Sequence, residues 1–272
     1  NVKGAVHIKG EVVVDPFLIP MSYASHAVDN GAEIRTGFRV ESAEFSDGKW
    51  RVTSSSGEEL TSRIVICCVG NHADILFAKL KGPSASPAPF VNKPRKGQYC
   101  IFSKSSLLTR PLQPVPTSFT KGVFVFSTLY GNIVAGPTAE EQEDRVVAEC
   151  DEETQAMLRD TAYSRVPALK GQAEVVRSYA GLRPATTERD YQFQLDFKRQ
   201  FLSVASIRST GLTASLGIGR AVATLITSVF EVEVDQGKEV RFTPFPDVEV
   251  LAKDYRDAGD GTVDIPVIGR RR

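Results

Sequence analysis

Histidine and cysteine are scarce in this sequence, and neither sign of charge is in excess. The 272 residues include 3 histidines and 4 cysteines, and 33 basic residues balance 33 acidic ones, so the formal net charge at pH 7 is zero. This balance gives no indication of a nucleic-acid partner or of an anionic membrane surface. No apolar run has the length of a membrane span, and we expect no signal peptide.

The cysteine spacing does not indicate a metal site. Cys67, Cys68, Cys100 and Cys150 form no CxxC pair and no metal-ligand pattern. Cys67 and Cys68 lie in the run RIVICCVG, where small buried residues are expected. We therefore predict no metal and free thiols, which indicates a reducing, intracellular compartment, either cytoplasmic or mitochondrial.

Several catalytic signatures are also missing. The sequence has no P-loop, no Ser/His/Asp arrangement, no paired-carboxylate motif and no N-terminal strand followed by a GxGxxG turn. Gly217 and Gly219 resemble part of such a turn, but Val222 replaces the third glycine. A dinucleotide turn also needs its glycines directly at a strand end, and the preceding strand ends near Ile207. We expect these two glycines to lie within a helix and to permit close helix–sheet packing.

The sequence contains a mixture of helical and strand patterns. Helices are predicted over Phe17–Asn30, Ala73–Leu80, Thr138–Tyr163 and Thr213–Phe230. Strands are predicted over Val12–Val14, Glu33–Arg35, Val40–Phe45, Lys49–Ser54, Glu58–Thr61, Arg63–Val69, Gly97–Phe102, Gly122–Ser127, Asn132–Ala135, Glu174–Tyr179, Tyr191–Leu195 and Phe201–Ile207. Thr138 and Glu141 have capping-box spacing, and the apolar run Arg63–Val69 suits a strand buried on both faces.

The order of these elements predicts a mixed α/β fold. The α/β pieces at both ends flank a mostly antiparallel middle, as expected when a substrate-covering domain is inserted into a Rossmann-like nucleotide-binding domain. We place the nucleotide-binding domain at residues 1–82 and 176–236, and the inserted antiparallel-sheet domain at 83–175. Residues 237–272 are predicted to be a C-terminal extension.

Arg183 is the first candidate for ligand binding. It follows a predicted strand in the segment GLRPATTERD, and Pro184 keeps its backbone extended. A guanidinium offers a planar fork that matches a carboxylate or phosphate, and the alternative is local pairing with Glu188 or Asp190. Arg208 is either a second anion contact or an ordinary surface arginine.

A long apolar helix is predicted soon after Ile207. Its start is surrounded by Ser209, Thr210, Gly211, Thr213 and Ser215, which supply cap oxygens and a backbone that a ligand can approach closely. A helix N-terminus carries about half a positive charge and free amide donors. It could therefore stabilise negative charge on an electron-accepting ring, and the alternative is an ordinary capped helix packed on a sheet.

The histidines offer two candidate proton acceptors. His7 lies in an apparent substrate-facing strand, and His72 follows Gly70 at a predicted strand end. Each is also compatible with a structural role. His26 lies on a predicted helix and is expected to be exposed or packed.

An ordered series of segments carries a family resemblance. The segments are GEVVVDPF (Gly10–Phe17), IVICCVGNHAD (Ile64–Asp74), PRKGQY (Pro94–Tyr99), TKGVF (Thr120–Phe124), YGNIVAGPTAEE (Tyr130–Glu141), GLRPAT (Gly181–Thr186) and STGLTASLGIG (Ser209–Gly219). Together they resemble the D-amino-acid-oxidase-type FAD-dependent oxidoreductases. Within that superfamily they are similar to the glycerol-3-phosphate dehydrogenase-like and L-2-hydroxyglutarate dehydrogenase-like branch.

The resemblance implies FAD as the cofactor and assigns residues to it. Val40 resembles the position whose backbone contacts the adenine, and Gly70 resembles the glycine that passes close to the diphosphate or ribityl chain. Gly211, Leu212 and Thr213 resemble the loop whose amides face the flavin ring.

The resemblance also implies a substrate site. Arg183 resembles the residue that grips the phosphate or carboxylate of the substrate, and Arg208 and His7 are further candidate substrate contacts. The segment PRKGQY would lie in a strand near the flavin, and Gly131-Asn132 on the sheet of the substrate domain. No catalytic residue is assigned.

The implied function is FAD-dependent dehydrogenation of a small anionic hydroxy compound, such as glycerol 3-phosphate or a 2-hydroxy acid. Electrons would pass to a quinone, oxygen or another carrier, and peripheral membrane association of the full-length protein is left open. One alternative is an FAD-dependent amine or amino-acid oxidase. The other is a non-catalytic fragment that cannot hold FAD alone, because family members begin with a GxGxxG segment. We expect an incomplete FAD domain, and in some members an iron–sulfur domain follows.

Overall fold

The structure is a computed structural model that describes residues 3–82, 88–117, 121–188, 190–233 and 240, together with the backbone of 256–257 and 263–264. The chain divides into two compact units. The first comprises Asn1–Val14, Ser42–Arg51 and Thr61–Gly211, and the second comprises Asp15–Glu41, Val52–Leu60 and Leu212–Arg272. The predicted domain boundaries at 82 and 176 both fall inside the first unit, so the separate substrate domain stays a prediction. The predicted C-terminal extension lies almost wholly outside the described residues.

The helical elements of the described chain are the α-helices α1 (Leu18–Asp29), α2 (Ala73–Lys81), α3 (Glu152–Arg165) and α4 (Gly211–Val229), with two 3₁₀ turns, η1 (Gly70–His72) and η2 (Pro167–Leu169). The predicted helices over Phe17–Asn30, Ala73–Leu80 and Thr213–Phe230 are confirmed as α1, α2 and α4. The last of these begins two residues earlier than expected.

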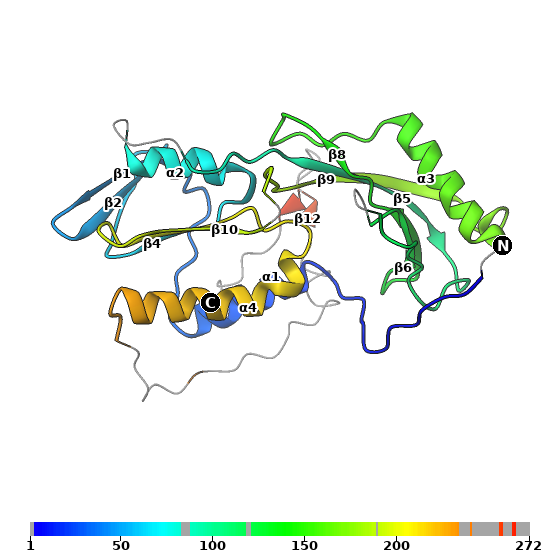
Figure 1. Cartoon of the computed structure of the whole chain (residues 1–272), viewed down its shortest axis with the longest axis horizontal. Coiled ribbons are helices and arrows are strands. Elements are labelled where there is room, and N and C mark those ends of the chain that lie inside the picture. The colour runs from blue at the N-terminus through cyan, green and yellow to red at the C-terminus, as the bar shows by residue number, and fades with distance from the viewer. Residues whose placement is uncertain are drawn as a thin grey trace. The chain divides into compact units, whose positions relative to one another are not determined.

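The strands belong to four sheets (Figure 1). They are β1 (Val40–Ser46), β2 (Lys49–Ser54), β3 (Glu59–Ser62), β4 (Val65–Cys67), β5 (Arg95–Lys104), β6 (Phe124–Ser127), β7 (Asn132–Gly136), β8 (Glu140–Glu141), β9 (Val175–Arg183), β10 (Gln192–Asp196), β11 (Phe201–Ala205), β12 (Arg256–Asp257) and β13 (Val263–Asp264). Their orders are β1-β2-β3, β10-β11-β4 and β12-β13, and a five-stranded sheet has the order β6-β7-β5-β8 with β9 also paired to β5.

The predicted hairpin and the predicted antiparallel middle are confirmed. β1 and β2 are joined at Asp47 and Gly48, which both have positive φ, 51° and 73°, as the mirror-image hairpin turns require. In the five-stranded sheet β5 runs antiparallel to β7, β8 and β9, and β6 runs antiparallel to β7. In contrast, β11 pairs in parallel with β4 and antiparallel with β10.

One core of the first unit lies between α3 and the five-stranded sheet (Figure 1). Its fully buried members include Cys100 and Phe102 on β5, Ile133 on β7, and Leu158 and Ala162 on α3. Successive residues of a strand point to opposite faces, so the residues of β5 between these buried ones face away from α3. That second face of β5 carries the candidate substrate site.

A second, aromatic core packs α2 against β11. Trp50 is 1% exposed, and its ring lies 6.0 Å from that of Phe201. Phe77 of α2 lies 5.6 Å from Phe201 and 6.0 Å from Phe90. The indole of Trp50 also donates to the carbonyl of Arg199 at 2.6 Å, which fixes the turn before β11. Phe201 is the first residue of β11, so this core packs against the amino end of that strand, while a smaller cluster of Ala73, Phe90 and Ala205 lies at its carboxyl end.

The predicted helix over Thr138–Tyr163 is wrong in its first half. Glu140 and Glu141 form β8 and pair with β5. Thr138 does not cap a helix, because its hydroxyl accepts from the amide of Gln98 at 3.0 Å. The helix begins only at Glu152, where Asp151 accepts from the amide of Thr154 at 2.8 Å. Sheet pairing therefore overrides the local capping-box pattern.

Three predicted strands also differ from the structure. Residues Val12–Val14 and Glu33–Arg35 lie in no strand. The run Arg63–Val69 forms only the short strand β4, and Ile66 is 40% exposed rather than buried. Within the described chain β4 pairs with β11 alone. It is therefore an edge strand there, although its continuous apolar run had predicted a strand buried on both faces.

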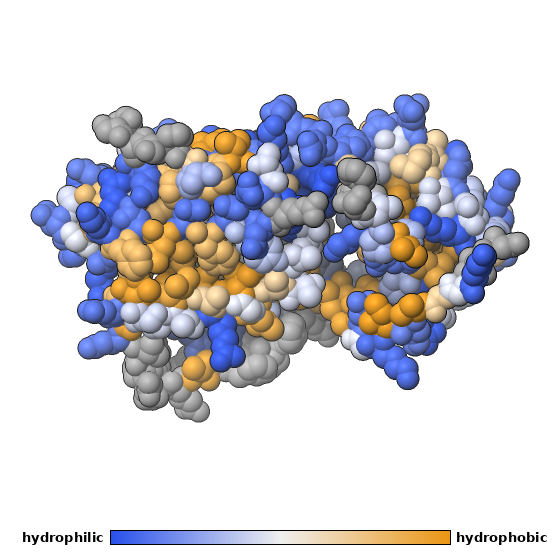
Figure 2. Space-filling view, in the orientation of Figure 1, coloured by the Kyte–Doolittle hydropathy of each residue, from blue (hydrophilic) through white to orange (hydrophobic). Residues whose placement is uncertain are grey.

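The expectation that no apolar segment has spanning length does not hold for α4. By length and composition alone, α4 could cross a membrane, with a mean hydropathy of 1.4 over its best window. None of its residues is buried in the described chain, and Leu216 is 72% exposed. Figure 2 shows apolar residues gathered where Figure 1 places α4. A largely apolar helix of this length is equally typical of the core of a globular protein.

Candidate functional site

A face of the β5–β9 ladder gathers the candidate substrate residues. In the antiparallel register Arg95 lies opposite Arg183, Gly97 opposite Gly181, and Tyr99 opposite Tyr179. Residues directly opposite in such a ladder share one face. The face turned away from α3 therefore carries a row of two arginines, a row of two glycines and a row of two tyrosines.

Arg183 lies over the backbone of β5. Its Nη2 donates to the carbonyl of Thr138 at 2.9 Å. A Cβ built on Gly97 would stand 2.1 Å from that same Nη2 and 3.2 Å from the Cβ of Pro137. Gly97 therefore leaves the space that the guanidinium occupies. At Gly181, on the paired strand, an added Cβ would meet nothing within 4 Å.

The two arginines face each other without a carboxylate between them. Neither Arg95 nor Arg183 forms an ion pair with any residue of the described chain, and the Nε of Arg95 is buried with no hydrogen-bond partner. The alternative that Arg183 pairs with Glu188 or Asp190 is not found there. Like charges directly opposite in a ladder are destabilising. An anion bound between them would remove that repulsion.

Two stacked tyrosines border the glycine row. The rings of Tyr99 and Tyr179 are nearly parallel, with centroids 4.5 Å apart and an angle of 10° between them. Burial, with a smaller contribution from Tyr99, raises the pKa of Tyr179 to about 12. Tyr179 is therefore neutral at physiological pH, and the two rings present an aromatic surface on the face that carries the two arginines.

Arg208 braces the segment that follows Arg183. Its Nη2 donates to the carbonyl of Thr186 at 2.9 Å and also to the carbonyl of Glu188. The Nε of Arg208 is buried without a partner in the described chain. Two backbone contacts of Nη2 thus hold the loop next to Arg183, and the anion contact of Arg208 stays a prediction.

The candidate cofactor side lies at the carboxyl ends of β4 and β11. Gly70 follows β4 in the η1 turn with φ +59°, and an added Cβ there would meet nothing within 4 Å. β11 runs parallel to β4 and ends at Ala205. In open α/β sheets ligands bind outside the carboxyl ends of parallel strands. Gly70 was expected directly at the end of a strand, but it lies three residues after Cys67, the last residue of β4. Its contact with a cofactor stays a prediction.

The residues at these strand ends fit a polar, elongated cofactor such as FAD. The Oδ1 of Asn71 and the Nε of Arg208 are buried without partners in the described chain, so an acceptor and a donor are both available. An added Cβ at Gly70 would meet nothing within 4 Å, so the backbone there is open to a diphosphate. Gly211 is more crowded, since its added Cβ would stand 3.0 Å from Cγ2 of Ile207.

Three of the predicted FAD contacts belong to the second unit, which is described by itself. Val40 is the first residue of β1 and is half-buried. Leu212 and Thr213 lie in the first turn of α4 and are exposed. Their predicted roles stay predictions. The expected capping is not seen at Thr210, whose hydroxyl lies 2.6 Å from that of Tyr191.

The two glycines inside α4 also differ from expectation. Gly217 and Gly219 lie within the helix, as predicted, and not at a nucleotide turn. An added Cβ at either would meet nothing within 4 Å in the described chain, so the close packing expected there is not seen.

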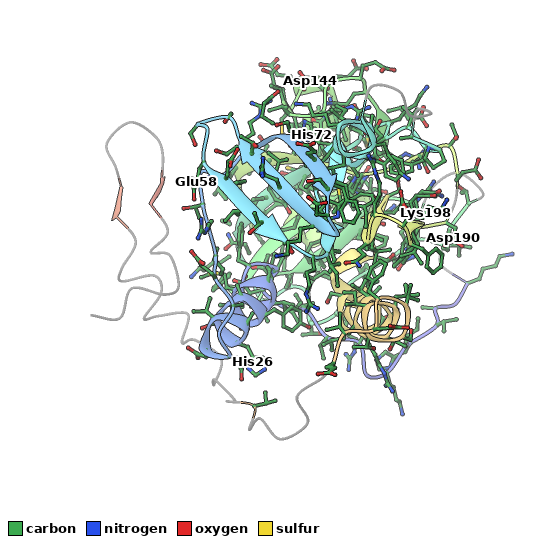
Figure 3. The ribbon with its side chains drawn as sticks, turned by 90° about the vertical axis from the view of Figure 1, so that its left-hand side faces the viewer. His26, Glu58, His72, Asp144, Asp190 and Lys198 are labelled. Carbon is green, nitrogen blue, oxygen red and sulfur yellow. The ribbon has the colours of Figure 1, made fainter. Side chains whose placement is uncertain are left out.

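In the part of the chain that the structure describes, no hydrogen bond joins His7 or His72 to Arg95 or Arg183. Residues around His7 form no strand, and its Nε2 accepts from Nε of Arg110 at 3.2 Å. His72 is exposed at the end of η1, and His26 lies on α1 (Figure 3). Among the residues that the structure describes, no group of histidine, cysteine and acidic side chains could hold a metal.

The sequence assigned no individual role to Arg95 or Gly97, two residues of this face that belong to the segment PRKGQY. Arg95 and Gly97 alternate along β5, and alternation places them on one face. That signal was present in the sequence. Their position opposite Arg183 and Gly181 depends on the register between distant strands, which local sequence does not show.

Comparisons with known proteins find a family model and relatives that this chain resembles. The family model described as "DAO: FAD dependent oxidoreductase" matches residues 1–225. Glycerol 3-phosphate dehydrogenase of Caloramator mitchellensis is 27% identical over 233 residues, covering 84% of this chain and 47% of that protein. Glycerol 3-phosphate oxidase of Mycoplasma genitalium is 25% identical over 234 residues, covering 83% and 59%.

Among solved structures, the dithionite-reduced L-alpha-glycerophosphate oxidase of Mycoplasma pneumoniae with FAD bound is similar, with a TM-score of 0.71 and 25% identity. The match covers 81% of this chain and 57% of that one. The chain therefore spans about half to three fifths of the length of the relatives that it matches.

Proposed function

We propose that this chain, which belongs to the DAO family of FAD-dependent oxidoreductases, takes part in oxidising a small anionic hydroxy compound. Glycerol 3-phosphate is the first candidate and a 2-hydroxy acid the second. The names of the relatives, glycerol 3-phosphate dehydrogenase and oxidase, support the first of these. In this proposal the substrate's C–H bond is broken by hydride transfer to the flavin.

The pairing of Arg95 with Arg183 carries the proposal. Two guanidinium groups on one face, with no carboxylate between them, are suited to a dianion such as a phosphate ester. A single carboxylate would neutralise only one of them. We therefore favour a phosphorylated substrate over a 2-hydroxy acid.

The residues of the chain bind and orient the substrate in this proposal. Arg183, held against the carbonyl of Thr138, grips the anion, while the bare backbone at Gly181 leaves room for the carbon chain. The stacked Tyr99 and Tyr179 limit the water on that side. FAD, when bound, supplies the hydride acceptor, and fixed placement of substrate and acceptor accounts for much of the rate.

On the cofactor side, we propose that Gly70 and the residues after β11 receive FAD. The open space at Gly70 and the unpartnered Oδ1 of Asn71 support a polar ligand there. Val40, Gly211, Leu212 and Thr213 are proposed contacts by resemblance. The proton acceptor is left unassigned, with His7 and His72 as the candidates to test.

The electron acceptor and the compartment are also proposals. Oxygen fits the relatives named oxidases, and a quinone or another carrier fits those named dehydrogenases. Peripheral membrane association would suit a quinone. Cys67, Cys68, Cys100 and Cys150 are all free, which supports a reducing intracellular compartment. Burial raises the pKa of the thiols of Cys67 and Cys100, so these two stay protonated.

The decisive experiment is to express the chain, add FAD, remove the excess and record the visible absorption of the protein. A retained flavin spectrum supports the proposal for this polypeptide. A folded but colourless protein would show that the chain alone is the non-catalytic fragment considered as an alternative, and the same test would then be made with a longer natural chain.

A substrate panel then chooses the reaction. We expect dye reduction with glycerol 3-phosphate, weaker reduction with 2-hydroxy acids, and none with glycine or other amines. Amine oxidation without any oxidation of hydroxy compounds would replace the proposed reaction by that of an amine or amino-acid oxidase. His7→Gln and His72→Gln, measured with the best substrate, test the two candidate bases.

A further inference from the structure

A buried amide joins the carboxyl ends of two parallel strands. Asn92 is 1% exposed and lies in the segment that leads into β5. Its Nδ2 donates to the carbonyl of Gly70 at 3.0 Å, and its Oδ1 accepts from Oγ of Ser206 at 2.9 Å. Because Gly70 follows β4 and Ser206 follows β11, one side chain bridges both strand ends.

Ser206 has an unusual backbone for a residue with a side chain. Its φ is +57°, and it is fully buried. L-residues other than glycine and asparagine seldom adopt this conformation, and they keep it when surrounding contacts determine it. The hydrogen bond to Asn92 is such a contact. The turn that leads from β11 to Arg208 therefore depends on Asn92.

The backbone amide of Asn92 adds a second link to the Gly70 turn, through Asp74 and Arg145. The amide of Asn92 donates to Oδ2 of Asp74 at 3.1 Å, and Asp74 forms an ion pair with Arg145. Arg145 in turn donates to the carbonyl of Asn71 at 2.7 Å, beside Gly70. The η1 turn is thus held from two sides.

The next residue connects this cluster to the substrate side. The amide of Lys93 donates to the carbonyl of Ala185 at 2.7 Å. Ala185 follows Arg183 by two residues, and Arg95 follows Lys93 by two residues. A single segment therefore contacts the Gly70 turn, the end of β11 and the loop beside both arginines.

We propose that Asn92 is a positioning residue of the cofactor site, which holds the Gly70 turn and the Ser206 turn at the spacing that FAD requires. The inference rests on the proposed function, since FAD is the ligand that these turns would receive. Asn92 acts through the backbone of its neighbours and has no assigned contact with the cofactor. Sequence reasoning did not single it out.

Asn92→Ala tests this directly. Loss of the amide leaves the Gly70 carbonyl and the Ser206 hydroxyl without their buried partners. We expect the dissociation constant for FAD, measured by flavin fluorescence, to rise about tenfold, with a changed visible spectrum of the bound flavin. We also expect faster amide hydrogen exchange at residues 70–72 and at 206–208 together, with or without FAD.

Ser206→Gly keeps the proposal testable if Asn92→Ala folds poorly. Glycine accepts φ +57° without strain, so this change removes the hydroxyl while it favours the backbone. We expect weaker FAD binding despite unchanged or improved thermal stability. The double variant Asn92→Ala/Ser206→Gly should bind FAD no more weakly than Asn92→Ala alone, because both changes break one bridge.

Gln98→Ala is the matched control. Gln98 is a buried amide on the α3 side of β5, where it hydrogen-bonds Asp151 and Gln155. Gln98→Ala should lower thermal stability without altering FAD affinity or the amide hydrogen exchange at residues 70–72 and 206–208. Equal loss of FAD affinity in both variants would show that Asn92 acts only through global stability and would overturn the proposal.

The exchange experiment separates this inference from the proposed function. If the wild-type chain binds no FAD, the proposed function fails for this polypeptide. The Asn92 bridge, which is its two hydrogen bonds to Gly70 and Ser206, is then tested by amide hydrogen exchange alone. Exchange at residues 70–72 and 206–208 that stays unchanged in Asn92→Ala would refute the bridge whatever the flavin result.

Discussion

The guanidinium of Arg183 lies where a side chain of Gly97 would otherwise begin. A Cβ built on Gly97 would stand 2.1 Å from Nη2 and 2.8 Å from Cζ of Arg183. The two residues come from paired strands, and each glycine of the row has a different environment, because the Cβ position of Gly181 is open. The smallest residue of β5 therefore determines where the guanidinium proposed to bind the anion lies.

Gly97→Ala should displace Arg183 and leave the fold intact, because the clashing atoms are the far end of a flexible side chain. We expect the KM for the anionic substrate to rise about tenfold, with unchanged flavin content and thermal stability lowered by no more than about 1 kcal/mol. Gly181→Ala is the matched control and should leave KM unchanged. Similar KM values for both variants would contradict the assigned position of Arg183.

Arg95→Gln should stabilise the ligand-free chain and weaken anion binding. Removing one of two opposed cations relieves about 0.5 kcal/mol of repulsion, so the midpoint of thermal unfolding should rise slightly. Inorganic phosphate should raise that midpoint in the wild type and much less in the variant. Arg177→Gln is the control, since Arg177 lies opposite Ile101 on the same ladder. An equal response to phosphate in all three proteins would argue against an anion site.

Arg183→Ala and Arg208→Ala should differ in how they respond to added guanidinium ion. Arg183 is proposed to contact the anion, so its loss should lower kcat/KM about 100-fold, and millimolar guanidinium should restore part of it. Arg208 binds backbone carbonyls, so its loss should be smaller and should speed amide exchange over residues 184–188. Rescue of Arg208→Ala and not of Arg183→Ala would reverse the two roles.

Acid should destabilise the first unit below about pH 4. Burial raises the pKa of Asp74, but hydrogen bonds from Arg145 and Asn92 outweigh it and hold the pKa below its usual value. The amides of Gln98 and Thr154 lower the pKa of Asp151 to about 2. A carboxylate with a lowered folded-state pKa contributes stability above its unfolded pKa, and that contribution is lost as pH falls toward the folded value.

The acid prediction is checked by urea unfolding at pH 5, 4, 3 and 2. Trp50 is the single tryptophan of the chain and is buried in the aromatic core, so its fluorescence reports the unfolding of that core. The midpoint should fall steadily with pH, and Asp74→Asn should flatten the decline. Asp160→Asn, a change at an exposed position of α3, should not. A wild-type midpoint that stays constant down to pH 2 would count against these contacts.

Several elements could be predicted because their signals are local. The Asp47-Gly48 turn needs two residues with positive φ, and the pattern on either side alternates. The helix α4 follows from a continuous apolar pattern, and Gly70 follows from its place at the end of an apolar run. The family resemblance also rests on short segments, each read by itself.

The predictions for Thr138 and Ile66 were wrong because each depends on neighbours that are distant in the sequence. Thr138 and Glu141 have the spacing of a helix start, yet β5 offers backbone partners that make this segment a strand. Local propensity is weaker than the sheet hydrogen bonds that a distant strand provides. Ile66 was expected to be buried but is 40% exposed, because β4 lies at the edge of its sheet in the described chain.

The sequence by itself determined the family and predicted free cysteines and an arginine close to a strand that ends at Tyr179, whereas in the structure that strand extends to Arg183. Only the tertiary structure decided that Arg183 faces Arg95, lies over Gly97 and is connected through Lys93 to the Asn92 bridge. These relationships depend on strand register and on contacts between residues far apart in the chain. A shift of one residue in the β5–β9 register would place the same side chains on the opposite face.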